Sequence, residues 1–311
     1  MLYCKQANFL FFMSNDNNCN QYAYTHLGAL IRIDVSLKNN IPEFSRTFLS
    51  EILKSGLITV NAIIITKGSF KVKDGNKIVV TIPKPATLTT NALPLEIIDE
   101  QADFLIINKP AGILTHPAPS CKNVLSIAEM IANKLIFPTD HPHANRAGIV
   151  HRLDKDTSGL LIVAKNMEAQ NHLADIFQNH KIVKKYLAVV DGIPTRNEFV
   201  IDKPIGRDPS NPSKMRLFGI AAKPAYSKAK VLKTGNELAL LEVTITTGRT
   251  HQIRVHLASL GCPVVGDSVY GKPSPLIHRQ ALHAFFLAFS YKGQEFLYQS
   301  PLPTEMNILP N

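Results

Sequence analysis

The region after residue 95 alternates short apolar runs with turn residues and contains few helical segments. Its first run, LEIIDEQADFLIINKP (95–110), is typical of a hairpin that turns at residues 100–102. Because strands follow one another without regular helical crossovers, the pattern predicts an α+β fold with a mainly antiparallel mixed sheet. Further strands are expected at 186–192, 228–234 and 238–248, and helices at 172–180 and 250–261.

Residues 31–84 have the pattern of a small separate unit. The segment SRTFLSEILKSG (45–56) has a Ser45 cap, apolar residues at helical spacing and a Gly56 stop. Together with the segment before it, this predicts a helix pair, followed by short strands at 57–60, 63–66 and 77–82. The unit has nine basic residues (32, 38, 46, 54, 67, 71, 73, 77, 84) against four acidic ones (34, 43, 51, 74). This bias favours an RNA-binding surface.

The chain is therefore expected to divide at a linker. PKPATLTTNALP (83–94) is rich in proline and threonine and reads as a connection without regular structure. The expected organisation is an N-terminal extension (1–30) that is a candidate for disorder, a small α/β domain (31–84), a linker (85–94) and a second domain (95–311). The start, MLYCKQANFLFFM, lacks a cleavage site, so a secretory signal is not expected, and Met13 is an alternative start.

Composition limits the class of protein. Of 311 residues, 45% are hydrophobic and 19% charged, which is typical of a folded chain. The net charge of +10 favours nucleic acid or an anionic surface as a partner. No apolar run approaches the roughly 20 residues of a membrane span. Cysteines 4, 19, 121 and 262 form no C-x-x-C pair, which fits a reducing cytoplasm.

The cluster HRLDKDTSG (151–159) suggests two kinds of site, a metal site and a pair of catalytic carboxylates. A metal is not expected, because no H-E-x-x-H or comparable spacing is present and arginines stand beside the candidate ligands. Those candidates are His151, Asp154, Asp156, His251 and His256. Of the two carboxylates, Asp154 has cationic neighbours that keep it ionised, so it suits a nucleophile or base better than a proton donor.

HRLDKDTSGLLIVAK (151–165) closely resembles the signature of RluA-type pseudouridine synthases. The resemblance continues in family order through KKYLAVV, DKPIGRDPSNPSKM, KPAYSKAKV, TTGRTHQIRVHLASLGCPVVGDSVYG and RQALHA. Residues 32–61 are similar to the S4 RNA-binding module, with Ala62 in place of the usual glycine. Within the family the chain looks most like the RluD branch, which acts on large-subunit ribosomal RNA.

The resemblance implies roles for three residues. Asp154 would be the nucleophile or base that begins breakage of the uracil N1–C1′ bond, and Tyr186 would lie against the target base. Arg254 would pair with Asp154, and the expected helix 250–261 would place His251 and Arg254 on one face. Six residues are expected to contact RNA: Arg46, Lys54, Lys109, Arg152, Arg249 and His251. His151 and His251 are also expected to orient loops.

The implied reaction detaches uracil at N1 and reattaches it through C5, with loss of the C5 proton. No electrons are exchanged and no group is transferred, so neither a cofactor nor a metal is expected. The carboxylate can attack the sugar or take its C2′ proton, and both routes stay open. The base must first leave its stack, at a cost of roughly a few kcal/mol.

Three alternatives stay open: a ribosome-assembly factor that binds RNA without catalysis, a synthase that acts on transfer RNA, and a glycosidase that releases uracil. The intact set of Asp154, Tyr186 and Arg254 argues against a pure binder. The segment GKPSPLIH (271–278) is shorter than in RluD-type proteins, which puts substrate choice in question more than activity. A monomer without an obligatory protein partner is expected.

Overall fold

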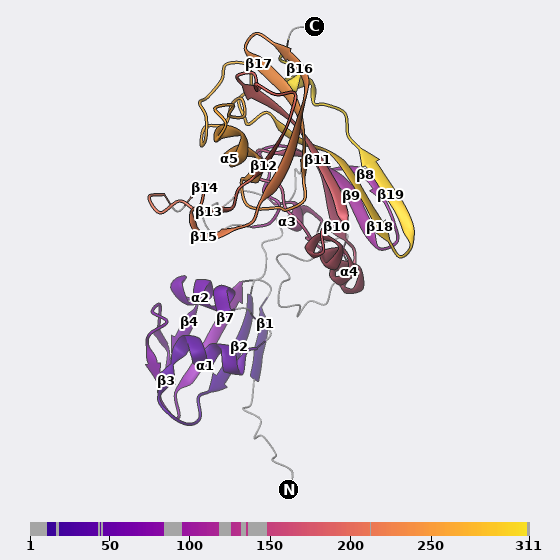
Figure 1. The fold of residues 1–311 in the computed structure, drawn as a ribbon. Coiled ribbons are helices and arrows are strands. Elements are labelled where there is room, and N and C mark those ends of the chain that lie inside the picture. Colours follow the sequence, from indigo (N-terminus) through magenta and orange to yellow (C-terminus); the bar gives the residue numbers. More distant parts are fainter. Residues whose placement is uncertain are drawn as a thin grey trace. The chain divides into compact units, whose positions relative to one another are not determined.

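The computed structural model describes residues 11–16, 19–42, 44, 46–83, 95–117, 126–131, 135, 148–211 and 213–309. The chain forms two compact units, Met1–Asn91 with Pro138–Ala144 and Ala92–Phe137 with Asn145–Asn311. Each unit has a hydrophobic core of its own (Figure 1).

The N-terminal unit contains two helices and a five-stranded sheet with the order β1-β2-β7-β4-β5. The helices are α1 (Ile33–Asn40) and α2 (Arg46–Lys54), and both bury apolar side chains against the sheet. The strands are β1 (Phe11–Asp16), β2 (Cys19–Thr25), β4 (Ile58–Val60), β5 (Ile63–Ile64) and β7 (Lys77–Pro83). A separate pair joins β3 (Ile31–Arg32) to β6 (Lys71–Val72). The predicted helix pair with a small sheet is confirmed.

Two positions in this unit have the positive φ that favours glycine. Gly56 (φ +73°) follows α2, and the next N–H, of Leu57, bonds back to the carbonyl of Ile52. Gly56 is thus the predicted helix stop, whereas Ser45 lies outside the described residues. Ala62 (φ +66°) lies in the tight connection from β4 to β5, so the alanine stands where glycine would be less strained.

The expected N-terminal extension is corrected for residues 11–16 and 19–25, which form β1 and β2. Strand β2 pairs with β7 along its whole length, so these two strands complete the sheet. Tyr24 is buried in the core and its hydroxyl lies 3.1 Å from Ser36 Oγ. The alternating tyrosines of NQYAYT account for this, because every second residue of a strand faces the same side.

The second unit is built on a nine-stranded sheet with the order β12-β16-β17-β11-β18-β10-β9-β8, in which β19 also pairs with β18. Strands β10 and β18 run parallel, and the other neighbouring pairs in this sheet are antiparallel. The strands are β8 (Glu96–Glu100), β9 (Phe104–Lys109), β10 (Ser158–Ala164), β11 (Ile182–Asp191), β12 (Glu198–Asp202), β16 (Tyr226–Gly235), β17 (Leu238–Ile245), β18 (Leu282–Tyr291) and β19 (Gln294–Gln299). The predicted α+β class with a mainly antiparallel mixed sheet is confirmed, as is the first hairpin.

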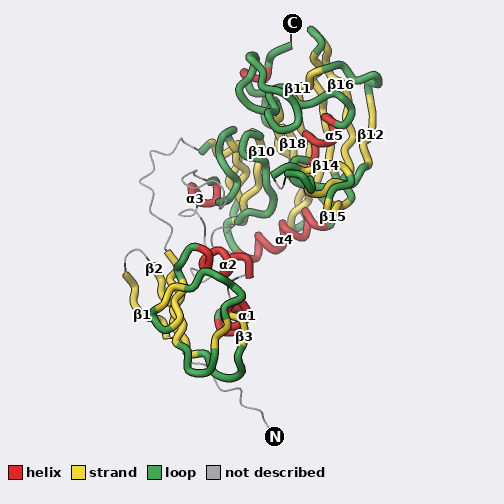
Figure 2. Tube along the Cα trace, turned by 90° about the vertical axis from the view of Figure 1, so that its left-hand side faces the viewer, coloured by secondary structure: helices red, strands yellow, loops and turns green. Residues whose placement is uncertain are grey.

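Smaller elements complete this unit. A three-stranded sheet has the order β14-β13-β15, and it lies beside α5 (Figures 1 and 2). These elements are β13 (Ile205–Arg207), β14 (Met215–Leu217), β15 (Ile220–Lys223), α3 (Ile127–Ile131), α4 (Met167–Gln178), α5 (Gln252–Ala258) and a short 3-10 helix (Thr304–Met306). In the part of the chain that the structure describes, no helix is long and apolar enough to cross a membrane.

Two helix boundaries differ from the sequence prediction. Helix α4 begins at Met167 rather than His172, because Asn166 accepts a hydrogen bond from Ala169 N–H and caps it there. Helix α5 begins at Gln252, because His251 has φ +56° and is not helical. The idea that His251 and Arg254 share a helical face is therefore wrong, although both reach the same carboxylate.

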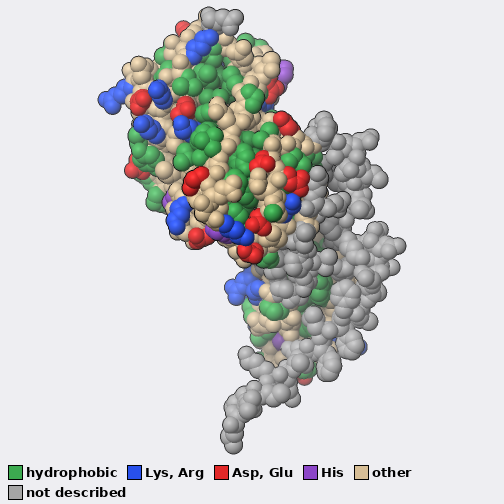
Figure 3. All heavy atoms as spheres, turned by 90° about the vertical axis from the view of Figure 1, so that its right-hand side faces the viewer, with side chains coloured by type: hydrophobic (Ala, Val, Ile, Leu, Met, Phe, Trp, Pro, Cys, Tyr) green, Lys and Arg blue, Asp and Glu red, His purple; other side chains and the backbone are tan. Residues whose placement is uncertain are grey.

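Charged side chains of both signs lie on one face of the second unit. On the side shown in Figure 3, basic and acidic side chains are interspersed instead of forming one basic area. Several surface pairs are of this kind, such as Lys185 with Glu242 at 3.1 Å and Arg279 with Glu305 at 2.6 Å. The chain's positive charge therefore does not by itself mark a binding face there.

Candidate active site

The loop before β10 carries Asp154 and is fixed on both sides of it. Leu153 donates its N–H to Thr115 Oγ1 (3.1 Å) and accepts the Thr115 hydroxyl proton at its carbonyl (2.8 Å). The carbonyl of Lys155 accepts hydrogen bonds from Lys109 Nζ (2.9 Å) and from Gly112 N–H (3.0 Å). The peptide units next to Asp154 are held in place, so its carboxylate has a defined position.

His151 orients the beginning of this loop. Its Nε2 accepts a hydrogen bond from Ile162 N–H (2.9 Å), and its ring stacks on Phe177 with the centroids 4.4 Å apart. Burial, and then the charge of Lys184, lower the pKa of His151 to about 3. The ring is thus neutral near pH 7 and serves to hold the loop against β10.

Arg254, on α5, lies between two carboxylates. Its Nη1 donates to Asp154 Oδ2 at 3.0 Å, while Nε and Nη2 donate to the two oxygens of Asp267 at 2.6 and 2.8 Å. Although burial opposes it, hydrogen bonds and charge from Asp267 and Asp154 raise the pKa of Arg254. The guanidinium is a permanent cation whose orientation is set by the bidentate pair with Asp267.

Asp267 is buried, and its carboxylate accepts two backbone N–H groups in addition to the hydrogen bonds from Arg254. Its Oδ1 accepts the backbone N–H groups of Val269 (2.9 Å) and Tyr270 (3.2 Å). Although burial opposes it, hydrogen bonds and charge from Arg254 lower the pKa of Asp267. This carboxylate therefore stays ionised and joins the loop at 267–270 to the arginine that faces Asp154.

His251 and Tyr270 form a second contact to Asp154. His251 Nε2 lies 4.0 Å from Asp154 Oδ2, and its Nδ1 lies 2.8 Å from the Tyr270 hydroxyl. That hydroxyl also accepts Met215 N–H at 2.8 Å, and the Tyr270 ring lies 5.1 Å from the Arg254 guanidinium carbon. Burial lowers the pKa of His251 despite the nearby Asp154, so the imidazole is neutral near pH 7.

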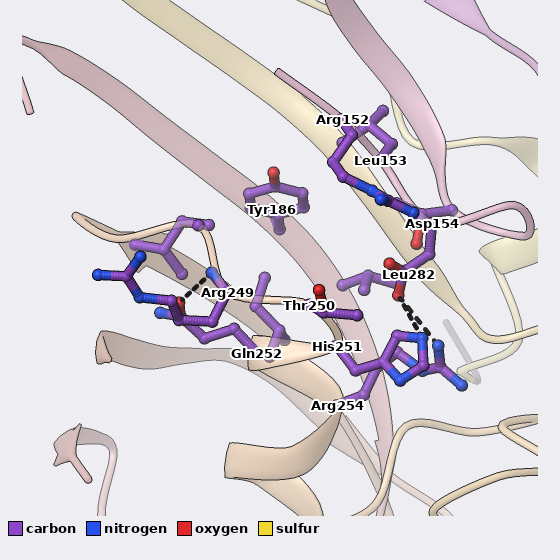
Figure 4. A pocket seen from close by; sticks show the side chains of 14 residues that line it. Arg152, Leu153, Asp154, Tyr186, Arg249, Thr250, His251, Gln252, Arg254 and Leu282 are labelled. Atoms are coloured by element: carbon purple, nitrogen blue, oxygen red, sulfur yellow. Dashed lines mark hydrogen bonds and ion pairs between the residues drawn. The ribbon is translucent and has the colours of Figure 1, made fainter. Parts of the chain in front are cut away.

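Tyr186, from β11, lines the same pocket as Asp154 and Arg254 (Figure 4). The side chain is only 8% exposed, and burial followed by the negative charge of Asp154 raises the pKa of Tyr186. Its phenol therefore keeps its proton. Apolar side chains, Leu153, Ile245 and Leu282 among them, and several polar ones, such as Thr157 and Gln252, complete the lining.

The six residues predicted to contact RNA fall in different places. Arg152 is exposed at the pocket rim, His251 faces Asp154, and Arg249 donates from Nε to the Pro224 carbonyl at 2.9 Å. Arg46 and Lys54 are exposed on α2 of the N-terminal unit.

Lys109, the sixth, requires a correction. Its side chain is fully buried, and Nζ donates to the carbonyls of Pro110 (2.9 Å), Ile113 (2.8 Å) and Lys155 (2.9 Å). All three N–H groups of the ammonium are therefore used inside the protein. Lys109 holds the loop of Asp154 and does not face RNA.

The candidate metal ligands are not assembled into one site. His151 bonds to Ile162 N–H, and His256 bonds to Ser227 Oγ and the Lys203 carbonyl. Among the residues that the structure describes, no group of three His, Cys, Asp or Glu side chains could hold a metal ion.

Two residues of this site had no predicted role, Asp267 and Tyr270. Both lie in GDSVYG (266–271), within a motif that carries the family resemblance. The available signal was an aspartate in an otherwise apolar and small-residue stretch, where a buried charge requires a partner.

Comparisons with known proteins identify relatives of this chain. A family model described as RNA pseudouridylate synthase matches residues 103–259. A Bacillus subtilis protein described as uncharacterized RNA pseudouridine synthase YlyB is 38% identical over 283 residues, 88% of this chain and 91% of that protein. Ribosomal large subunit pseudouridine synthase D of Nitrosomonas europaea is 38% identical over 90% of this chain and 83% of its own length. The solved structure of human RNA pseudouridylate synthase domain containing 1 has a TM-score of 0.56 and 27% identity, and the match covers 70% of this chain and 86% of that one.

Proposed function

Because the chain belongs to the RNA pseudouridylate synthase family and is an RNA pseudouridine synthase, we propose that it isomerises specific uridines of large-subunit (23S) ribosomal RNA. The relatives named ribosomal large subunit pseudouridine synthase D support this substrate, since one of them is 38% identical over 90% of the chain. Transfer RNA is the alternative substrate for the same chemistry.

Asp154 is the residue that we assign to bond breakage. One observation carries this assignment: its carboxylate lies at the pocket wall, 3.0 Å from an Arg254 that Asp267 already holds from the other side. The pairing places a guanidinium beside the Asp154 carboxylate and aims it, as a nucleophile or base requires. Attack at C1′ and removal of the C2′ proton both begin from this carboxylate.

The remaining steps follow from the balance of the reaction. The N1–C1′ bond breaks, the uracil turns within the pocket, the C5–C1′ bond forms, the C5 proton leaves to a base, and N1 takes up a proton in its place. Tyr186 is the ring on which the uracil lies while detached, and its protonated phenol neither competes with Asp154 as an anion nor repels the departing base.

RNA contacts are assigned to both units. We assign residues 31–84 to an S4-like RNA-binding domain, with Arg46 and Lys54 on its exposed helix, 85–94 to a linker and 95–311 to the catalytic domain. Arg152, Arg249 and His251 are the contacts assigned near the pocket. The enzyme acts as a monomer in the cytoplasm, where ribosomal RNA is available.

The test is release of tritium from 5-tritiated uridine in 23S ribosomal RNA. The wild-type chain should release it, whereas Asp154→Asn should bind the RNA and lose at least ~10³-fold in turnover. Asp156→Asn, two residues away, is the matched control and should keep most of the activity.

Turnover by Asp154→Asn comparable to wild type would remove Asp154 from the mechanism. Release from transfer RNA but not from ribosomal RNA would change the substrate and leave the reaction intact. Free uracil in the product would instead indicate a glycosidase.

A further inference from the structure

Lys184 is a buried cation with few partners. It lies on β11 two residues before Tyr186, so both side chains leave the strand on the same face. The side chain is 6% exposed, its Nζ lies 3.4 Å from the Thr247 carbonyl, and Nζ is 5.7 Å from the centre of the Phe177 ring. An ammonium has three N–H groups to donate, and this one has a single long hydrogen bond.

The neighbouring charged groups do not neutralise the charge of Lys184. Among the described residues, Lys184 forms no ion pair, whereas Lys185 next to it pairs with Glu242 at 3.1 Å. The charged group that acts on Lys184 is a second cation, Arg249. Arg249 uses Nε for the Pro224 carbonyl and turns its guanidinium away from the Asp154–Arg254 pair, on the other side of Tyr186 (Figure 4).

Gly248 leaves this pair of cations open to the pocket. Gly248 and Arg249 both line the pocket that contains Tyr186 and Asp154. A Cβ on Gly248 would lie 3.7 Å from Lys184 Nζ, so a side chain at this position would cover the amine. Nζ therefore lies next to a pocket-lining residue that has no side chain to cover it.

A buried ammonium without a counter-ion, next to a second cation, is costly in free energy unless an anion binds to it. We propose that Lys184 and Arg249 form a binding site for a phosphodiester of the RNA strand next to the uridine that enters the pocket. This rests on the proposed function for the identity of the RNA, while the chemistry of the site requires only a phosphate group. The site lies on the opposite side of Tyr186 from Asp154, so it would hold the strand while the base is turned.

The test uses binding by a catalytically silent chain. In the Asp154→Ala background, Lys184→Met should raise the Kd for a ribosomal RNA fragment ~10-fold and reduce the slope of log Kd against log salt by about one phosphate contact. Lys184→Arg should restore both. Lys185→Met, whose partner is Glu242 on the surface, is the matched control and should change neither.

Thermal stability gives a second test, because Lys184→Met is expected to weaken RNA binding without lowering the melting temperature. Because Lys184→Met removes an uncompensated buried charge, its melting temperature should be equal to or higher than that of the parent. A raised melting temperature with an unchanged Kd and salt slope would overturn the site. So would a weaker Kd with a lowered melting temperature and an unchanged slope, since that would mean general damage to the fold.

The pH dependence of RNA affinity is a further test of the Lys184 amine. Burial, followed by the charge of Arg249, lowers the pKa of Lys184 to about 8. The groups around it are the Arg249 guanidinium and His151, and His151, with a pKa of about 3, stays neutral from pH 7 to 9. RNA affinity should therefore fall as the pH rises through about 8 in the Asp154→Ala parent, and this fall should be absent in Lys184→Met.

Two further experiments test the phosphate site by itself and separate it from the proposed RNA substrate. Inorganic phosphate should compete with the RNA fragment in the parent more strongly than in Lys184→Met; equal competition would exclude Lys184 as a phosphate ligand. If the wild-type chain releases no tritium from the RNA while the Lys184 effect on Kd is present, the proposed substrate fails and the phosphate site stands.

Discussion

Lys109 and Lys184 are two buried lysines of the second unit that differ in how their charge is compensated. Lys109 donates to three carbonyls at 2.8 to 2.9 Å, whereas Lys184 has one carbonyl at 3.4 Å and the ring of Phe177. Burial lowers the pKa of both, to about 7 for Lys109 and to about 8 for Lys184. Burial alone therefore does not tell a structural lysine from one that awaits a ligand; the acceptors around the amine do.

Arg254 gives the third case, a buried cation whose charge is matched. Two carboxylates, Asp154 and Asp267, take three of its N–H groups. The three cations form a series: Arg254 is paired with carboxylates, Lys109 is bound by carbonyls, and Lys184 is open to a further partner. In this series the first aims a reactive group, the second fixes the loop that carries it, and the third leaves room for the substrate.

The largest expected effect comes from removing the carbonyl-bound amine. Lys109→Met removes the donor to the carbonyls of Pro110 and Ile113 and leaves the Lys155 carbonyl with Gly112 N–H alone. Losses of about 1–3 kcal/mol for each of the first two groups predict a total of about 2–6 kcal/mol. The melting temperature should fall sharply, and activity should fall with it because the Lys155 carbonyl beside Asp154 is held less firmly. Thermal unfolding followed by circular dichroism measures the first effect.

The control for this change is Lys155→Met, since the Lys155 side chain is exposed and only its carbonyl is used. It should leave the melting temperature nearly unchanged. Equal stability of Lys109→Met and wild type would contradict the distinction between the two buried lysines, because Lys109 would then resemble Lys184.

A smaller effect is expected from unpairing Arg254 on one side. Asp267→Asn keeps the shape but removes one carboxylate, so we expect a loss of about 2 kcal/mol in unfolding free energy and ~10²-fold in turnover. Arg254 would then be less firmly aimed at Asp154. Tritium release and thermal unfolding, measured on the same preparation, test both parts.

The pH dependence of stability sharpens this prediction. Since the pKa of Asp267 is lowered in the folded chain, the unfolded chain binds more protons below about pH 5, and stability falls as the pH falls. Asp267→Asn should be less stable than wild type near pH 7, with a shallower decline toward acid pH. An identical decline in the two chains would show that Asp267 is not the ionised partner of Arg254.

Sequence patterns predicted the class of the fold and the residues that meet at the pocket, but not the groups that hold them. The strand pattern gave the antiparallel sheet, and family motifs marked Asp154, Tyr186 and Arg254. Lys109 was predicted to contact RNA, whereas its burial depends on carbonyls brought together by two loops, as few lysines are fully buried. Asp267 was missed for the same reason, since its partner is 13 residues earlier on another element.

The smallest expected effect tests how His251 is held beside Asp154. The Tyr270 oxygen accepts Met215 N–H, so its own proton is available for His251 Nδ1 at 2.8 Å. The imidazole proton then lies on Nε2, which faces Asp154 at 4.0 Å. Tyr270→Phe should cost about 1 kcal/mol of stability and ~10-fold in kcat, with little change in KM.

Nitrogen-15 NMR of the histidine side chains measures the state of His251 directly. In wild type, Nδ1 should be unprotonated, and in Tyr270→Phe the two tautomers should mix because the hydroxyl donor is lost. Tyr291→Phe, which removes a hydroxyl bonded to Asp103 at 3.1 Å, is the control and should leave the His251 signals unchanged. An Nδ1-protonated His251 in wild type would reverse the direction of this hydrogen bond. In that case Asp154 would be held by Arg254 alone.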